Sequence, residues 1–152
     1  TIPDSLTNCS NLTNLDLSVN SLASVIPPKL DLLSHLSYLN LSRNSLEGVI
    51  PTKVGLLSDL SYIDLSVNLL VGQIPPKLNC LSELIYLDFS VNLLVGQIPP
   101  SLGFLPNLAY IYLRSNQLEG SIPKLGQLPQ LQELLLGNNK LSGELPHAIL
   151  NS

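Results

Sequence analysis

An asparagine recurs through this chain at almost constant spacing. Its copies are Asn20, Asn44, Asn68, Asn92, Asn116 and Asn139, which lie 24 residues apart except for a last step of 23. Each copy closes the phrase L-x-x-L-x-L-x-x-N-x-L, in which Ile63, Phe89 and Ile111 replace single leucines. A fixed period of this length indicates a stacked solenoid, because one coil cannot bury its own apolar face without neighbours.

The middle of each phrase, x-L-x-L-x, alternates with period two and predicts a short strand. Its leucines should point inward and its x residues outward, with successive strands parallel and about 4.8 Å apart. The asparagine follows the strand, where the backbone turns inward and leaves polar groups that need partners. A side-chain amide offers two donors and an acceptor, so we predict a structural asparagine ladder linking the coils.

The second half of each repeat reads L-x-G-x-I-P, as in Leu46, Gly48, Ile50 and Pro51. Glycine permits a positive φ angle, and proline prevents the segment from continuing as a helix. The first copy has Ser24 where glycine is expected. The stretch that follows each proline is short, which predicts a 3-10 turn.

The combined phrase N-x-L-x-G-x-I-P-x-x-L resembles the plant-type leucine-rich repeat over nearly the whole chain. The resemblance implies an α/β fold class: a right-handed leucine-rich-repeat solenoid with a parallel β-sheet on the concave face and short 3-10 turns on the convex side. We expect one domain over residues 1–152, of about six repeats of 23–24 residues, without terminal caps. Because the chain enters and leaves in mid-repeat, we expect a fragment of a longer ectodomain.

Composition excludes several classes of protein. The chain is 45% hydrophobic and 12% charged, which argues against disorder, and its net charge of −4 disfavours nucleic acid or an anionic membrane as partner. Its apolar runs are too short to span a membrane. The sequence shows neither a Ser-His-Asp set, nor Cys/His metal spacing, nor a phosphate loop, so we expect no enzyme activity, cofactor or metal. His35 and His147 are both expected to be solvated.

The two cysteines do not suggest a disulfide. Cys9 falls in the column of Leu33 and Leu57, so we predict a buried thiol there. Cys80 lies about three coils away, beyond disulfide reach. An extracellular or cell-surface location is therefore predicted from the family resemblance and from the sequons at Asn8, Asn11 and Asn40.

Outward strand positions form columns across the predicted sheet. One column holds four of the five tyrosines, and the next holds two aspartates. Our predicted ligand-binding set is Tyr38, Tyr62, Tyr86, Tyr110, Tyr112, Asp64, Asp88, Arg43 and Arg114. Aligned tyrosines offer large rigid contact area at low entropic cost, although a ladder that merely stabilises the sheet is the alternative.

Asp64 and Asp88 fall on adjacent strands, about as far apart as the carboxylates of a retaining glycosidase. That chemistry requires one carboxyl group whose pKa is raised by burial. We expect the concave sheet to be open and wet, without such desolvation, and therefore reject a catalytic role.

The strings 66–76 and 90–100 are identical, and they place apolar side chains where other repeats have polar ones. These residues are Leu69, Val71, Leu93 and Val95. A contiguous apolar patch on a rim usually marks an interface, which we predict here for a co-receptor or for self-association, through the rim or the uncapped ends. The alternative is a recent duplication that copied harmless leucines.

The family resemblance implies recognition of a peptide or protein ligand on the concave face, as in a fragment of a plant receptor-like kinase or receptor-like protein. Two alternatives remain. One is a secreted inhibitor of a cell-wall-degrading enzyme, similar to polygalacturonase-inhibiting proteins. The other is a purely structural solenoid that self-assembles.

Overall fold

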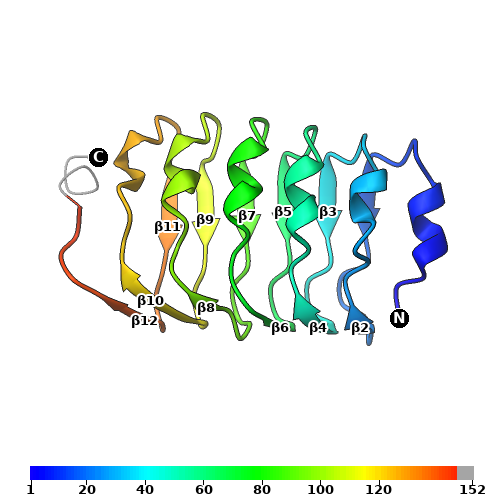
Figure 1. Cartoon of the computed structure of the whole chain (residues 1–152), viewed down its shortest axis with the longest axis horizontal. Coiled ribbons are helices and arrows are strands. Elements are labelled where there is room, and N and C mark those ends of the chain that lie inside the picture. Colours follow the sequence, from blue (N-terminus) through cyan, green and yellow to red (C-terminus); the bar gives the residue numbers. More distant parts are fainter. Residues whose placement is uncertain (147–152) are drawn as a thin grey trace.

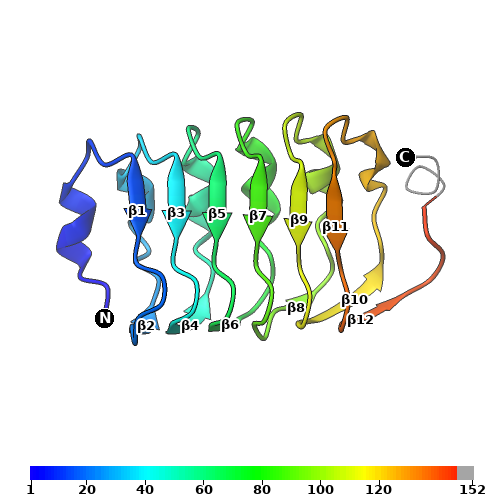
Figure 2. The same ribbon diagram turned by 180° about the vertical axis from the view of Figure 1, so that it is seen from behind.

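The computed structural model describes residues 1–146, and His147 lies outside them. The chain forms a single row of coils, stacked in sequence order from one end of the molecule to the other (Figure 1). Every coil contributes one strand to a sheet on one side and one 3-10 turn on the opposite side, as the front and back views show (Figures 1 and 2). The predicted right-handed solenoid is confirmed.

The main sheet consists of one strand from each repeat. Its strands are β1 (Asn14–Asp16), β3 (Tyr38–Asn40), β5 (Tyr62–Asp64), β7 (Tyr86–Asp88), β9 (Tyr110–Tyr112) and β11 (Glu133–Leu135). Neighbours pair in parallel, and the register places Tyr62 opposite Tyr86 and Asp64 opposite Asp88. The predicted columns are therefore correct, and the outward side chains of this sheet are called the concave face below.

The opposite side carries only 3-10 turns in the part of the chain that the structure describes. These turns are η1 (Asp4–Asn8), η2 (Leu30–Leu32), η3 (Thr52–Leu56), η4 (Pro76–Cys80), η5 (Pro100–Phe104) and η6 (Leu125–Gln127). Each follows an Ile-Pro or similar step, and the proline sets an extended φ that ends the preceding strand. Their bounds agree with the short turns that the sequence predicts.

Two further sheets of three strands each lie between the main sheet and the 3-10 turns, and the sequence phrase did not predict them. One contains β2 (Ala23–Val25), β4 (Ser45–Val49) and β6 (Leu69–Val71), and the other contains β8 (Val95–Gly96), β10 (Gln117–Ser121) and β12 (Lys140–Ser142). Val49 pairs with Val71, a step of 22 residues, whereas Tyr62 pairs with Tyr86, a step of 24. Side chains in these sheets therefore neighbour different residues from those that repeat alignment alone suggests.

The inward leucines form one continuous core along the stack. Leu33, Leu57 and Leu81 are fully buried, but Cys9, in the same column, is exposed. The prediction of a buried Cys9 is wrong because its coil packs against a neighbour on one side only. Cys80 is also exposed, and both thiols are free.

The repeated glycine adopts the left-handed conformation that it was predicted to allow. Gly48 has φ 76°, and a Cβ there would lie 2.9 Å from Cγ1 of Val25 in the preceding coil. Ser24, at the same position of the first repeat, has φ 94°. Serine thus occupies a backbone conformation that favours glycine.

Candidate functional site

The tyrosine column on the concave face is a stack of aromatic rings. The ring centroids of Tyr38 and Tyr62 are 4.4 Å apart with an interplanar angle of 11°, and those of Tyr62 and Tyr86 are 4.4 Å apart at 6°. The strand spacing of about 4.8 Å brings in-register side chains to this separation. The rings therefore cover one another's faces, and they present edges and hydroxyl groups to solvent.

The stack changes geometry beyond Tyr86. Tyr110 is tilted by 45° with its centroid 6.0 Å from that of Tyr86. Tyr112, from the neighbouring column, meets Tyr86 edge-on at 5.3 Å and 80°. The five predicted tyrosines thus form one continuous aromatic cluster, which we call the tyrosine ladder.

Hydroxyl groups of the ladder donate to acceptors of the protein itself. The Tyr86 hydroxyl donates to Oδ2 of Asp88 at 3.4 Å, and the Tyr110 hydroxyl donates to Oε1 of Gln132 at 3.0 Å. The Tyr112 hydroxyl donates to Oε2 of Glu133 at 2.6 Å. Since a phenol has a single proton, these hydroxyl groups can offer only lone pairs to a ligand.

The phenols stay protonated well above neutral pH. Burial, together with the nearby Asp64 carboxylate, raises the pKa of Tyr62 to about 12. Burial also raises the pKa of Tyr86, and the hydrogen bond to Glu133 raises the pKa of Tyr112 to about 12. Negative charge at the centre of the concave face therefore comes from its carboxylates.

Asp64 and Asp88 lie opposite each other on β5 and β7. Asp64 is 8% exposed, and its Oδ1 accepts the Ser66 backbone N–H at 2.9 Å. Burial raises the pKa of the Asp64 carboxyl, and the charge of Asp88 adds to this effect. The expectation that no desolvation would raise a carboxyl pKa on this face is therefore wrong, because the neighbouring tyrosine rings help to shield Asp64 from water.

Arg43 and Arg114 are both exposed, in the turns that follow β3 and β9. Arg43 has a left-handed φ of 56°, and the Arg114 side chain passes within 3.8 Å of the position that a Cβ would take on Gly137. Neither arginine forms an ion pair with another described residue. Both remain available to a ligand, at either end of the ladder.

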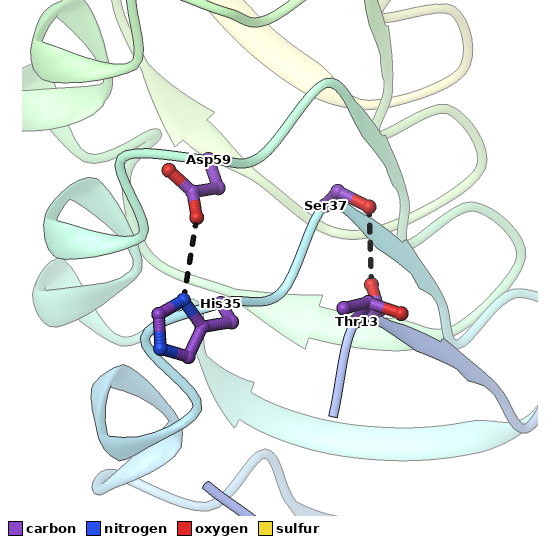
Figure 3. A network of polar contacts seen from close by, with 4 residues as sticks. All are labelled: Thr13, His35, Ser37 and Asp59. Atoms are coloured by element: carbon purple, nitrogen blue, oxygen red, sulfur yellow. Dashed lines mark hydrogen bonds and ion pairs between the residues drawn. The ribbon is translucent and has the colours of Figure 1, made fainter. Parts of the chain in front are cut away.

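The single ion pair within residues 1–146 lies away from the ladder. His35 Nδ1 is 3.7 Å from Oδ2 of Asp59, and both side chains are more than half exposed. Figure 3 shows this pair in the connections that lead from the 3-10 turns to the main sheet, beside the Ser37 hydroxyl, which donates to the Thr13 carbonyl oxygen at 3.2 Å. His35 is solvated, as predicted.

The apolar rim predicted from the duplicated strings is exposed. Leu69, Val71, Leu93 and Val95 are 49%, 41%, 42% and 40% exposed. Sequence alignment missed Val49, which is 58% exposed and lies opposite Val71 because of the shorter register step. The backbone N–H of Leu93 donates to the Leu70 carbonyl oxygen at 2.8 Å, so the row continues between the two small sheets.

The predicted glycosylation sites differ in accessibility. Asn8 and Asn11 are exposed. Asn40 is half-buried on the concave face, where its Oδ1 accepts the Ser42 N–H at 3.0 Å and its Nδ2 donates to the Tyr38 hydroxyl at 3.4 Å. A glycan on Asn40 would therefore start beside the first ring of the ladder.

A cavity of about 350 Å³ lies between η5 and η6 on the convex side, and the sequence did not predict it. Phe104, which is 73% exposed, and Lys124 and Gln127 are among its lining residues. The repeat that ends at Asn139 is one residue shorter than the others, and η6 has three residues where η5 has five. That deletion was the sequence signal for this irregularity.

Comparisons with known families agree with the repeat phrase. The model described as Leucine Rich Repeat matches residues 11–33, 35–57 and 83–105, and the model described as Leucine Rich repeats (2 copies) matches residues 106–147. These families indicate no catalytic activity. No curated protein matches the chain in a sequence search.

Several solved structures of plant receptors match nearly the whole chain. The TDR receptor is 38% identical, with a TM-score of 0.96, over 97% of this chain and 26% of that one. The ectodomain of the membrane receptor kinase GASSHO1/SCHENGEN3 from Arabidopsis thaliana, in complex with CASPARIAN STRIP INTEGRITY FACTOR 2, is 42% identical, with a TM-score of 0.95, over 97% and 18%. The Arabidopsis receptor kinase HAESA, in complex with the peptide hormone IDA and the co-receptor SERK1, is 39% identical, with a TM-score of 0.94, over 97% and 25%.

The chain spans about a quarter or less of the length of these receptors. It covers 69% of a chain in the BIR3–SERK2 complex from Arabidopsis thaliana, at 36% identity and a TM-score of 0.76. Across residues 1–146, no helix has the length and apolar character needed to cross a membrane.

Proposed function

Since this chain belongs to the leucine-rich-repeat family and its repeats are those of plant receptor-kinase ectodomains, we propose that it is an extracellular recognition module. In this proposal a peptide or protein ligand lies across the strands of the concave face. The site comprises the tyrosine ladder, Asp64 and Asp88, with Arg43 and Arg114 at its ends. The related structures with bound peptide ligands support this class of function.

The observation that carries the proposal is the continuity of the tyrosine ladder. It crosses β3, β5, β7 and β9, and its rings are held by stacking before any ligand arrives. Rigid, half-buried tyrosines are typical of contact residues that contribute most to binding energy. A sheet needs no such row for stability, because the inward leucines already form the core.

Selection from a random peptide library displayed on phage, against the wild-type domain, provides the test. Peptides that bind the concave face should lose more than about 2 kcal/mol of affinity with the Tyr62→Ala/Tyr86→Ala double variant. The matched control is Leu32→Ser/Leu56→Ser, which changes exposed side chains on the opposite side. Unchanged affinity in a folded tyrosine double variant would contradict the proposal.

We further propose that the apolar rim docks another leucine-rich-repeat ectodomain acting as co-receptor. Its members are each at least 40% exposed and project from one edge of the coils. HAESA has been crystallised with the co-receptor SERK1, and BIR3 with SERK2, so related ectodomains do associate. A peptide on the concave face and a partner on the rim could bind at the same time.

A further inference from the structure

We propose that the centre of the concave face selects ligands that carry a guanidinium or ammonium group, which binds against the carboxylates of Asp64 and Asp88. The proposal rests on the ligand-binding function proposed above and names the chemistry that this site recognises. It is carried by the hydrogen-bonding state of the tyrosine ladder and by the partners that Asp64 lacks.

The centre of the ladder presents acceptors. The hydroxyl protons of Tyr86 and Tyr112 are already donated to Asp88 and Glu133. What these phenols leave toward solvent is oxygen lone pairs, and the carboxylates add only acceptors. A ligand group that contacts this region must supply hydrogen-bond donors.

Asp64 is only half satisfied although it is more than nine-tenths buried. Its Oδ1 accepts the Ser66 N–H, whereas Oδ2 has no hydrogen-bond partner among residues 1–146. The side chain stands at an outward position of β5, so that oxygen opens onto the concave face. A buried carboxylate oxygen without a partner carries a desolvation penalty that a donor from a ligand would relieve.

The protein supplies no cation of its own at this point. Arg43 lies close enough to lower the pKa of Asp64 slightly, but it forms no ion pair with Asp64. Arg43 and Arg114 sit in the turns beyond β3 and β9, on either side of β5 and β7. A ligand cation would therefore bind between two fixed cations, which restricts it to one register along the ladder.

Stacking excludes the main alternative, an aromatic or apolar ligand group. Both faces of Tyr62 are covered by Tyr38 and Tyr86, and the free side of Tyr86 meets the edge-on ring of Tyr112. No aromatic face is open at the centre for such a group. A guanidinium fits the remaining surface best, because its planar fork can donate to carboxylates on two adjacent strands.

The test uses two probes: an oligo-arginine peptide and the oligo-citrulline peptide of the same length, which is neutral and nearly isosteric. Isothermal titration at low ionic strength should show the wild-type domain binding the arginine peptide at least about tenfold more tightly than the citrulline peptide. The Asp64→Asn/Asp88→Asn double variant should lose most of this preference. The control Asp59→Asn/Glu83→Gln removes the same number of charges at exposed loop positions and should retain it.

Three results would overturn the inference: equal binding of both peptides, an equal loss in the control, or no measurable binding of the arginine peptide. The first is separable from failure of the proposed function. If both peptides bind equally and Tyr62→Ala/Tyr86→Ala weakens both, the concave face binds peptides without selecting cations. If the tyrosine variant also leaves affinity unchanged, the concave site itself is wrong.

Discussion

Asn68 and Leu41 lie in adjacent coils, and Nδ2 of Asn68 donates a hydrogen bond of 3.0 Å to the Leu41 carbonyl oxygen. The same amide accepts the Leu46 N–H at 3.0 Å through Oδ1. It also reaches the carbonyl oxygens of Leu65 and Ser66 within its own coil. One side chain therefore satisfies backbone groups of two coils, as the sequence predicted for the asparagine ladder.

Asn68→Ala should lower the free energy of unfolding by about 1–3 kcal/mol, because it leaves buried backbone groups without partners. Urea denaturation followed by circular dichroism measures the change. Asn20→Ala is the matched control, since Asn20 is exposed and bonds only within its own coil. Equal stability of Asn68→Ala and wild type would show that the ladder is not structural.

Ser24→Gly should stabilise the domain by about 1 kcal/mol, because glycine adopts the positive φ of this position without strain. The reverse exchange at an equivalent position, Gly48→Ser, should destabilise it. Besides its φ of 76°, the new Cβ would lie 2.9 Å from Cγ1 of Val25. The urea midpoints of the two variants should move in opposite directions, and a shift in the same direction would refute this explanation of the glycine.

The sequence predicted the concave face well and the flanking sheets poorly. Alternation within each phrase fixes which side chains point outward, and the constant spacing of 24 fixes the register, so the columns of Tyr62 and Asp64 followed directly. Neither pattern shows that neighbouring coils step by 22 residues along the small sheets. Val49 was therefore missed as a member of the rim.

Two other features depend on packing that a single repeat does not encode. Val67 has a left-handed φ of 55°, a conformation that β-branched residues rarely adopt, and nothing in its residue type signals it. The stacked rings bury Asp64 enough to raise its pKa, although each tyrosine read alone suggested an open surface. Both effects arise only when coils are stacked.

The raised pKa of Asp64 predicts a pH dependence of stability. The folded state keeps the Asp64 proton to a higher pH than the unfolded state, whose pKa is near the ordinary 3.8. Ionisation therefore opposes folding, and this contribution to stability is full below pH 3.8 and is lost as pH rises through the folded pKa. Asp88 raises this pKa further, while Arg43 and the hydrogen bonds from Ser66 partly offset the shift.

Urea denaturation of wild type and Asp64→Asn between about pH 3 and pH 6 measures this effect. Asparagine keeps an oxygen that can accept the Ser66 N–H but does not titrate. The stability of wild type relative to the variant should fall as pH rises. A difference that stays flat, or increases with pH, would contradict the assigned direction.

Secretion from a eukaryotic host should yield protein glycosylated at Asn8, Asn11 and Asn40. A glycan on Asn40 would cover the first coils of the concave face, next to Tyr38, and restrict ligands to the later strands. Asn40→Gln should then increase peptide binding near β3, while Asn8→Gln should not. Glycopeptide mass spectrometry determines occupancy, and a bare Asn40 would leave the whole ladder open.

The apolar rim should act in association rather than folding. Leu69→Ser/Leu93→Gln introduces the residue types that other repeats carry there, so the solenoid should keep its stability. The rim could contribute about 300 Å², which is less than the roughly 800 Å² per partner of a standard interface, so neighbouring coils must take part. Removing two exposed leucines should therefore weaken association about tenfold, or about 1.4 kcal/mol, without abolishing it.

Sedimentation velocity measures self-association, and surface plasmon resonance with the SERK1 ectodomain as probe measures co-receptor docking. The control Leu32→Ser/Leu56→Ser alters leucines of similar exposure on the 3-10 turns and should change neither result. Loss of SERK1 binding with a monomeric wild type supports docking of another ectodomain. Loss of a wild-type dimer instead assigns the rim to self-assembly. If wild type is monomeric and the rim variant binds SERK1 as wild type does, the exposed leucines are only a product of duplication.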